Sequence, residues 1–234
     1  MATIKVMSAG AVQAMVTALG AEFERASGNT LDLNFDTAGS VRARFKNGEH
    51  LDLLILPAAV MEALEKEGAF VPGTRVDLGR TVTGVAVKEG AALPDISTPA
   101  AFKQALLAAR TVSYTDPQAG GSSGTFFAGL LQRLGIADEI NKKALLGARG
   151  VEVAQLVAEG RAEIGSTFIS EILTVPGAKV VGPLPKELDN ANTYTAAIPI
   201  DAKAREQALG LLRTLTEPSS RPRWIVAGLE PAFP

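Results

Sequence analysis

The stretch SYTDPQAGGSSGTFFAGLLQRLGI (Ser113–Ile136) joins a short strand-like segment to an amphipathic helix-like segment through a turn of glycines and serines. Small side chains favour a tight turn, and the first turn of a helix exposes backbone N–H groups that have no partner within the helix. Two explanations are open for this turn. Either it caps the helix and redirects the chain, or it holds a negatively charged ligand.

The same strand–turn–helix pattern repeats along the chain. Apolar runs predict strands at residues 4–7, 31–35, 51–56, 81–88, 111–114, 163–167, 179–182 and 192–200. Apolar residues spaced by three and four predict helices at about 12–23, 41–45, 61–64, 102–109, 124–134, 151–159 and 204–215, followed by a short C-terminal helix. This alternation predicts an α/β fold with parallel sheets and helical crossovers.

The composition excludes several classes of function. The chain has 234 residues, of which 47% are hydrophobic and 21% charged, and its net charge of −2 gives no sign of a nucleic-acid partner. It has no cysteine and one histidine, His50, which we expect to be exposed and inert. We therefore expect no metal site and no cofactor. No apolar run reaches the ~20 residues of a membrane span, so we expect no membrane insertion.

Three turns deserve comparison because each follows a predicted strand and opens a predicted helix. They are Met7–Ala11, Asp36–Ser40 and Gln118–Thr125. In open α/β sheets, ligands lie outside the carboxyl ends of the strands. Capping is the simpler explanation for any one turn, but three such turns in one chain favour an anion site. None has the glycine-rich pattern of a nucleotide-binding loop.

Two arginines lie near these turns. Arg42 follows the second turn closely, and Arg149 precedes the helix predicted near Gly150. A guanidinium binds a carboxylate through two parallel hydrogen bonds, so either residue could hold an anionic ligand. The alternative is an ion pair on the surface, Arg42 with Glu49 or Arg149 with Glu152. Both explanations stay open for both arginines.

Six segments together resemble the molybdate-binding-protein branch of the type 2 periplasmic solute-binding proteins. They are IKVMSAGAVQAMVTALGAEFERASG, FDTAGSVRARFKNGEHLDLLIL, YTDPQAGGSSGTFFAGLLQRLGI, LVAEGRAEIGSTFISEI, VVGPLP and WIVAGLEPAF. The resemblance covers nearly the whole chain and implies two α/β lobes with a ligand cleft between them. Residues 1–83 and 195–234 would form the first lobe and residues 84–194 the second. Strands near 81–87 and 194–198 would form the hinge.

The resemblance also implies the ligand-binding residues. Hydroxyl groups that this family uses fall here on Ala11, Ala38 and Phe168, which have none, whereas Arg42 and a longer glycine loop are additions. These departures favour a di- or tricarboxylate over molybdate or tungstate. Tyr194 either lines the cleft or packs in the core. The expected ligand-binding set is Ser8, Gly10, Ala11, Thr37, Ala38, Gly39, Ser40, Arg42, Ser122, Ser123, Gly124, Thr125, Arg149, Gly150, Phe168 and Tyr194.

A binding protein for a small organic anion or oxyanion, serving ABC-type uptake, is therefore the expected function. The alternative is an isomerase that acts on a small unsaturated carboxylate, because aconitate isomerase is similar in fold. Its acid and base would be Asp36 and Glu171, while Asp116 would cap a turn.

The expected partners are the anion and an ABC transporter permease, and we expect a monomer. The sequence shows no export signal at its N-terminus. We therefore expect a periplasmic location if a signal peptide has been removed, and a cytoplasmic location if Met1 is the native start.

Overall fold

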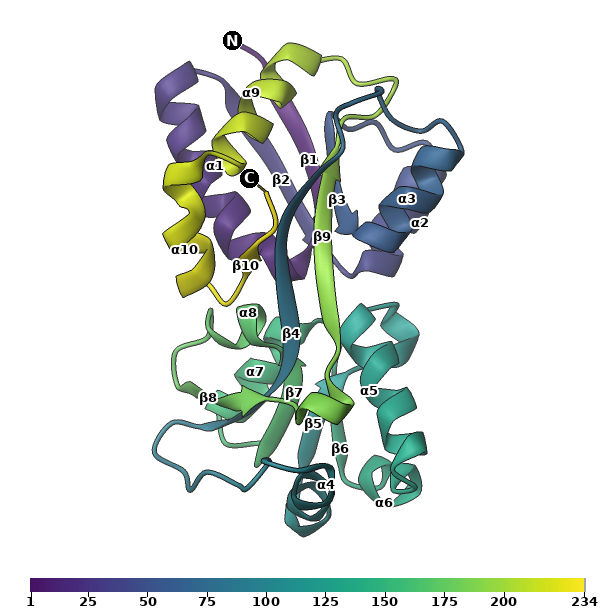
Figure 1. The fold of residues 1–234 in the computed structure, drawn as a ribbon, viewed down its shortest axis with the longest axis vertical. Coiled ribbons are helices and arrows are strands. Elements are labelled where there is room, and N and C mark those ends of the chain that lie inside the picture. Colours follow the sequence, from purple (N-terminus) through teal and green to yellow (C-terminus); the bar gives the residue numbers. More distant parts are fainter. Residues whose placement is uncertain (234) are drawn as a thin grey trace. The chain divides into compact units, whose positions relative to one another are not determined.

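The computed structural model describes residues 1–233, which divide into two compact units. Unit 1 contains Met1–Arg80 and the chain from Asn192 onward, and unit 2 contains Thr81–Ala191. The chain passes between the units twice, in strands β4 (Val76–Lys88) and β9 (Ala191–Ala197) (Figure 1). Unit 2 is therefore one continuous segment, whereas unit 1 is assembled from both ends of the chain.

The sheet of unit 1 is built around β1. Its strands are β1 (Thr3–Ala9), β2 (Thr30–Asp36), β3 (Leu53–Pro57), most of β9, and the short β10 (Glu230–Pro231). Strand β1 pairs in parallel with β2 and β3, and Ala9 lies opposite Asp36. Strand β9 runs antiparallel to β3, and β10 antiparallel to the start of β4. The turns that follow β1 and β2 therefore lie side by side.

Helices cover this sheet because their apolar residues recur at helical spacing. Met15, Val16, Leu19 and Phe23 of α1 are all buried, as their spacing predicts. Figure 1 shows α1, α9 and α10 beside one face of the unit 1 sheet and α2 and α3 beside the other. These helices are α1 (Gln13–Ser27), α2 (Ala38–Lys46), α3 (Ala58–Lys66), α9 (Arg205–Leu215) and α10 (Arg221–Val226).

The sheet of unit 2 is built around β5, which pairs in parallel with β6 and β7. Strand β4 runs antiparallel to β7 and β8. The bounds are β5 (Val112–Thr115), β6 (Ala144–Gly147), β7 (Ile164–Phe168) and β8 (Ala178–Pro183). Because β5, β6 and β7 share one direction, the turns after their carboxyl ends lie at one edge of the sheet.

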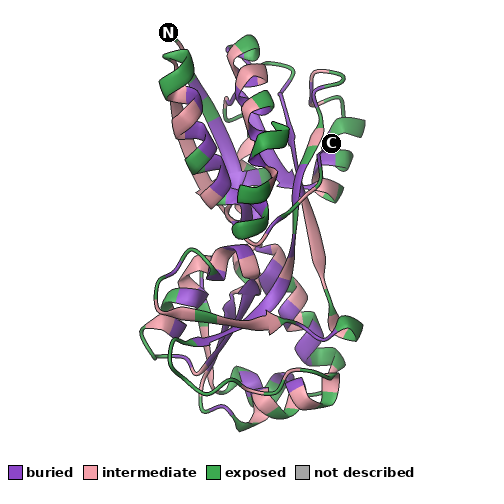
Figure 2. Ribbon diagram, turned by 60° about the vertical axis from the view of Figure 1, so that its left-hand side comes forward, coloured by how far each residue is buried: buried purple, intermediate pink, exposed green. Residues whose placement is uncertain are grey.

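Two apolar clusters hold the helices of unit 2 on its sheet. One contains Phe102, Phe127 and Leu130, all with no exposed surface, and the other contains Ala154, Val157 and Ile172. In Figure 2 the strands of each unit are mainly buried, while the helices alternate between buried and exposed residues. The helices are α4 (Pro99–Ala108), α5 (Ser122–Arg133), α6 (Ala137–Asn141), α7 (Gly150–Ala158) and α8 (Ile169–Ile172).

Short 3₁₀ helices complete the described chain. They are η1 (Gly10–Val12), η2 (Pro117–Ala119), η3 (Lys186–Leu188) and η4 (Pro218–Ser220). Among residues 1–233, no helix is both long and apolar enough to cross a membrane.

The structure confirms the predicted α/β fold and corrects parts of it. The sheets are mixed rather than parallel, because β4 and β9 run against their neighbours. The sequence analysis missed β6, α6 and α8, each only four or five residues long. His50 is half-buried rather than exposed, and its Nε2 lies 3.9 Å from Oδ1 of the buried Asp52.

Candidate functional site

In the turn after β1, the serine hydroxyl bonds within the turn. Ser8 is fully buried, and its Oγ donates a hydrogen bond of 3.0 Å to the carbonyl oxygen of Ala9. Gly10 is half-buried and Ala11 is buried, and no side chain caps the 3₁₀ helix that begins there. The ligand contacts available at this turn are therefore backbone groups rather than the Ser8 hydroxyl.

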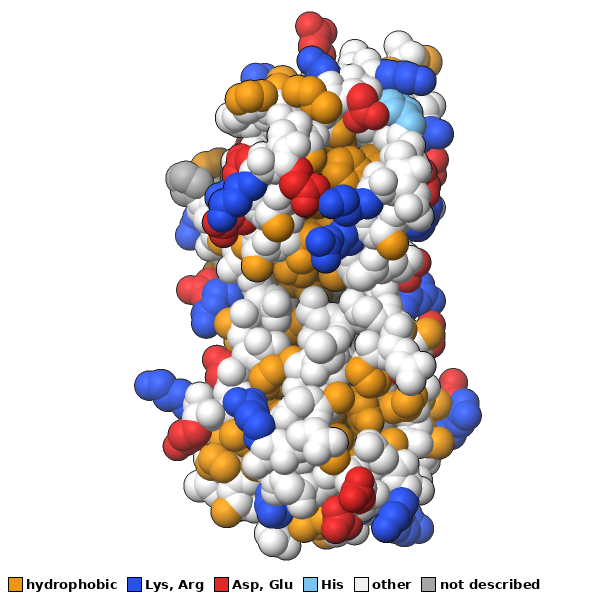
Figure 3. All heavy atoms as spheres, turned by 90° about the vertical axis from the view of Figure 1, so that its right-hand side faces the viewer, with side chains coloured by type: hydrophobic (Ala, Val, Ile, Leu, Met, Phe, Trp, Pro, Cys, Tyr) orange, Lys and Arg blue, Asp and Glu red, His pale blue; other side chains and the backbone are white. Residues whose placement is uncertain are grey.

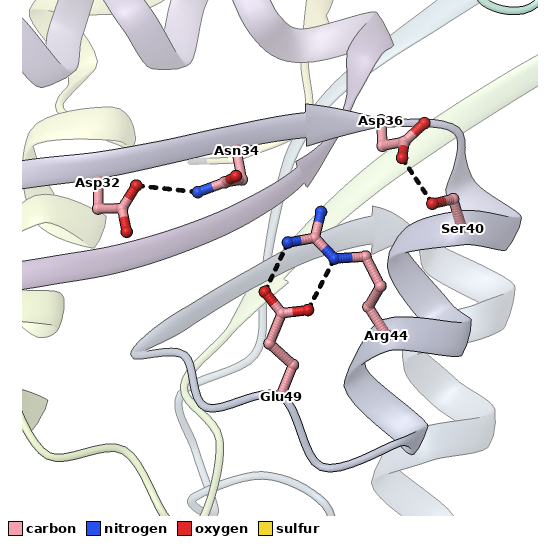
Figure 4. A network of polar contacts seen from close by, with 6 residues as sticks. All are labelled: Asp32, Asn34, Asp36, Ser40, Arg44 and Glu49. Carbon is pink, nitrogen blue, oxygen red and sulfur yellow. Dashed lines mark hydrogen bonds and ion pairs between the residues drawn. The ribbon is translucent and has the colours of Figure 1, made fainter.

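The turn after β2 is closed by its own side chains (Figure 4). The Oγ1 of Thr37 accepts a hydrogen bond from the backbone N–H of Ser40 at 3.2 Å. The carboxylate of Asp36 accepts bonds from the Thr37 N–H at 2.7 Å and the Ser40 hydroxyl at 2.6 Å. Ala38 is buried and Gly39 half-buried. The negative charge that a helix N-terminus attracts is therefore already supplied by the Asp36 carboxylate.

The two arginines of α2 have different surroundings. Arg44 binds the carboxylate of Glu49 with two hydrogen bonds, of 2.7 and 2.5 Å (Figure 4). The suggested ion pair between Arg42 and Glu49 is therefore wrong. Because α2 begins at Ala38, Arg42 lies in its second turn, where it is exposed. Within residues 1–233 its guanidinium forms no hydrogen bond or ion pair.

The turn after β5 leaves the start of α5 uncapped. Asp116 accepts a hydrogen bond of 2.8 Å from the Gln118 N–H, so this residue caps the preceding 3₁₀ turn, as expected. Gly121 is the N-cap of α5, and no side chain caps that end. The first backbone N–H groups of α5, including those of Ser122 and Ser123, consequently have no partner within the helix. Ser122 is half-buried, and Thr125 is exposed.

Gly124 has a packing reason as well as the predicted binding role. A Cβ atom added at this position would overlap the backbone carbonyl oxygen of Thr115. The first turn of α5 thus lies directly on the end of β5, and only glycine permits that approach.

The start of α7 lies at the same edge of the sheet, after β6. Arg149 is its N-cap, and no side chain caps the helix. The carboxylate of Glu152 accepts bonds from the Ala148 N–H at 2.9 Å and from Nε of Arg149 at 3.1 Å. The structure therefore contains the Arg149–Glu152 ion pair that was the alternative to ligand binding. The Glu152 N–H donates to the carbonyl oxygen of Arg149 at 3.1 Å, while the N–H groups of Gly150 and Val151 have no partner within the helix.

A row of hydroxyl groups connects the starts of α5 and α8. Ser123 Oγ lies 3.2 Å from Thr115 Oγ1 and 3.5 Å from Thr167 Oγ1, and Thr167 Oγ1 donates to Glu171 Oε2 at 2.6 Å. Thr115, Ser123 and Thr167 are all buried. The sequence analysis missed Thr115 and Thr167. Their position in the sequence could have indicated them, because each is a threonine at or next to the end of a buried strand.

Glu171 brings a carboxyl group into this row. The residue is half-buried, and a Cβ atom added at Gly150 would overlap its Oε2. Burial raises the pKa of Glu171 above its ordinary value, against smaller opposing effects of the Thr167 hydroxyl, the Phe168 N–H and the charge of Arg149. Gly150 therefore makes room for the carboxyl group, which retains its proton to higher pH than an exposed glutamate does.

The two predicted aromatic positions are buried. Phe168 is 3% exposed at the end of β7, and Tyr194 is 2% exposed on β9. Burial agrees with the core-packing explanation for Tyr194, and its role toward a ligand stays a prediction.

The remaining features of the described chain are its surface charge, its possible metal ligands and one cavity. Figure 3 shows basic and acidic side chains interspersed on one face rather than gathered in a basic patch. No group of three or more His, Asp or Glu side chains in the described chain could hold a metal ion. A cavity of about 520 Å³ in unit 2 is lined by residues such as Val87, Leu93 and Ile164, and none of the predicted binding residues lines it.

Comparison with known proteins identifies relatives along the whole chain. Residues 4–230 match the family described as bacterial extracellular solute-binding proteins. An aconitate isomerase of a Pseudomonas species is 29% identical over 98% of this chain and 88% of its own. The molybdate-binding protein ModA of Azotobacter vinelandii is 27% identical over 73% of this chain and 66% of its own.

Solved structures share the fold at low sequence identity. The periplasmic molybdate-binding protein of Azotobacter vinelandii superposes with a TM-score of 0.77 at 18% identity, over 97% of this chain and 98% of that one. The sulfate-binding protein SubI of Mycobacterium tuberculosis has a TM-score of 0.72 at 15% identity, over 100% and 88% of the two chains. At these identities the superpositions demonstrate a periplasmic-binding-protein fold.

Proposed function

The chain belongs to the bacterial extracellular solute-binding protein family, and from that membership we propose that it captures a small organic anion, a di- or tricarboxylate. The observation that carries this proposal lies in unit 2. Helices α5 and α7 begin at one edge of the sheet, and neither start is capped by a side chain. Backbone N–H groups at a helix start are a ready site for anionic oxygens.

The choice of a carboxylate rests on what the chain lacks and what it adds. Ala11, Ala38 and Phe168 have no hydroxyl group to donate to a compact oxyanion. Arg42 adds an exposed guanidinium that has no partner in the described chain. A guanidinium matches the two oxygens of a carboxylate in one plane. Apart from the hydroxyls of Ser8, Thr37 and Ser40, which bond within their own turns, the other predicted contacts stay part of this proposal.

A thermal-shift screen tests the proposal directly. The purified protein is heated with molybdate, tungstate, sulfate, phosphate and a panel of di- and tricarboxylates. A ligand at 100 times its dissociation constant stabilises the native state by about 2.7 kcal/mol. Stabilisation by a carboxylate, and less by molybdate and tungstate, supports the proposal. A screen in which only the inorganic oxyanions stabilise contradicts the choice of carboxylate.

The second candidate function is isomerisation of a small unsaturated carboxylate. It is favoured by the 29% identity to an aconitate isomerase and by the proton-retaining carboxyl group of Glu171. Asp36 is less suited to the chemistry, because its carboxylate already accepts two hydrogen bonds from its own turn. Incubation of any carboxylate that binds, followed by NMR, decides between the two. A new isomer supports the enzyme, and tight binding without conversion supports the receptor.

The proposed receptor works as a monomer with an ABC transporter permease, in the periplasm. Its family membership supports this setting. Release of the native protein from its cells by osmotic shock, without lysis, tests the location. Retention of the protein with cytoplasmic markers would contradict it and would favour the isomerase.

A further inference from the structure

Glu171 is the one carboxyl group that the row of buried hydroxyls reaches in unit 2. Thr167 Oγ1 is 2.6 Å from Glu171 Oε2 and 3.5 Å from Ser123 Oγ, and Ser123 Oγ is 3.2 Å from Thr115 Oγ1. Each hydroxyl carries one proton, so the Thr167 hydroxyl can donate either to Glu171 or to Ser123 but not to both. The direction of the whole row is therefore set at its Glu171 end.

The two charge states of Glu171 give opposite directions. An ionised carboxylate only accepts, so the Thr167 proton is held at Glu171, and Ser123 then donates to Thr167. A protonated carboxyl group can donate to Thr167 Oγ1, which frees the Thr167 proton for Ser123. Because Thr167 Oγ1 now accepts from Glu171 and donates to Ser123, the Ser123 hydroxyl no longer donates to Thr167. In this second direction the hydroxyl of Ser123 can donate either to Thr115 Oγ1 or to a ligand at the uncapped start of α5.

We propose that Glu171 is a positioning residue that takes up a proton when an anion binds at the start of α5, so that unit 2 presents hydroxyl donors instead of a second negative charge. This inference rests on the proposed function, because it needs an anion in contact with Ser123 or the first turn of α5. The proton comes from the solvent. It binds to the ionised carboxylate of Glu171, and no other bond is made or broken.

The surroundings of Glu171 suit this role. The carboxyl group lies where a side chain at position 150 would otherwise be, so Gly150 keeps it against Thr167. Helices and strands packed on α8 include α7, β7 and β8, and β4 also contacts it, because Gly84 lies against Ile169. The charged residues of β4 are Asp77, Arg80 and Lys88. The charged side chains of the other three elements are Arg149 at the start of α7, Glu152 and Glu159 along or just after it, and Lys179 on β8, while β7 has none. Arg149 is exposed and paired with Glu152, so it compensates only weakly for a charge on Glu171.

Calorimetry with sulfate and with fumarate tests the proposal, because neither probe changes its charge between about pH 6 and about pH 9. Each titration is repeated in two buffers that differ in ionisation enthalpy, which gives the number of protons taken up. The wild-type protein is expected to take up as much as about one proton per anion. Its affinity should fall as pH rises, by roughly tenfold per pH unit where Glu171 is ionised in the free protein.

Three variants make the test specific. Glu171→Gln keeps a donor and an acceptor beside Thr167 but cannot titrate, so it should bind without proton uptake and with affinity independent of pH. Thr167→Val breaks the row, so the anion should bind with little proton uptake although Glu171 is present. Glu159→Gln removes an exposed carboxylate at the far end of α7 and should behave as the wild type.

A second measurement needs no ligand. A carboxyl group whose pKa is raised in the folded state binds more protons folded than unfolded, so stability falls as pH rises from the ordinary pKa toward the raised one. The urea midpoint of the wild type should therefore fall relative to that of Glu171→Gln as pH rises. A constant difference between the two midpoints would overturn the inference.

The outcomes separate this inference from the proposed function. Binding of sulfate or fumarate by the wild type without proton uptake overturns the inference and leaves the anion receptor in place. A pH-dependent affinity that survives in Glu171→Gln does the same. If no anion of the screen binds to the wild type at any pH, the proposed function fails and the inference fails with it.

Discussion

The starts of α2 in unit 1 and α5 in unit 2 follow the same strand–turn–helix pattern, yet they satisfy their backbone N–H groups differently. In α2, Asp36 and Thr37 accept hydrogen bonds from the turn itself. In α5, the N-cap is Gly121, and no side chain takes that place. In α2 the carboxylate of Asp36 and the hydroxyl of Thr37 already accept hydrogen bonds at the helix start, so this turn is closed to an external anion. In α5 no side chain does so, and that turn is open to one.

A second difference concerns where the glycines are needed. Gly124 and Gly150 in unit 2 are fixed by close packing on Thr115 and Glu171. At the start of α2 the side chains of Asp36 and Thr37 make the contacts instead. The turn of unit 1 is therefore held by polar side chains, whereas the turns of unit 2 depend on glycines that leave room for close packing.

The largest expected effect comes from filling the packed glycine of α5. Gly124→Ala would drive a methyl group into the backbone oxygen of Thr115, which cannot swing away, and we expect a loss of about 3 kcal/mol in the free energy of unfolding. Gly129→Ala, on the exposed side of the same helix, is the control and should gain about 0.5–1 kcal/mol. Urea unfolding measures both. Equal effects of the two changes would remove the packing argument.

The next effect concerns the free arginine of α2. Arg42→Ala should weaken carboxylate binding by ~1.5–3 kcal/mol, as for a hydrogen bond to a charged group. Arg44→Ala is the matched control, because Arg44 is already held by Glu49 and should matter little to the ligand. Titration calorimetry compares them. Unchanged affinity in Arg42→Ala would exclude this residue from the site.

Opening the closed turn should have a smaller effect. Asp36→Ala removes the acceptor of the Thr37 N–H and the Ser40 hydroxyl, and we expect the protein to lose about 1 kcal/mol of stability. Asp32→Ala, on the same strand, removes an exposed contact with Asn34 and should change stability by less than about 0.5 kcal/mol. Thermal unfolding separates the two changes. The contrast between the units weakens if Asp36→Ala is as stable as the wild type.

Closing the open turn should have the smallest effect on stability and a clear effect on binding. The backbone of Gly121 is extended, with φ of −73° and ψ of 135°, which any residue can adopt. Gly121→Asp should add a cap to α5 worth about 0.5 kcal/mol and weaken anion binding, because the new carboxylate occupies the same N–H groups. Gly121→Ala serves as the control. Full anion affinity in Gly121→Asp would show that the open turn is not the site.

The sequence predicted the fold well where segments are long and periodic. The buried face of α1 and the apolar run of β3 follow from residue spacing alone. Strand β6 and helix α8 have four residues each, too few to establish a period. The direction of β4 and β9 also escaped prediction, because strand direction depends on which strands pair rather than on local pattern.

The candidate site was predictable as turns but not as side-chain contacts. Small and hydroxyl residues after strands predicted where the turns between strands and helices lie, since turn formation is local. The closure of the α2 turn by Asp36 required knowledge of where its side chain points. Glu171 was named as an acid or base, but its contact with Thr167 depends on where its side chain points, and its place beside Gly150 depends on how α7 packs against α8.

The division of the chain also bears on its synthesis. Unit 2 is complete once residue 191 has left the ribosome, whereas unit 1 then still lacks β9, α9 and α10. Until β9 arrives, one edge of the apolar strand β3 has no pairing partner. An uncovered edge of this kind invites association between nascent chains. A strand made late in synthesis, β9, therefore covers an exposed edge in the N-terminal part of unit 1.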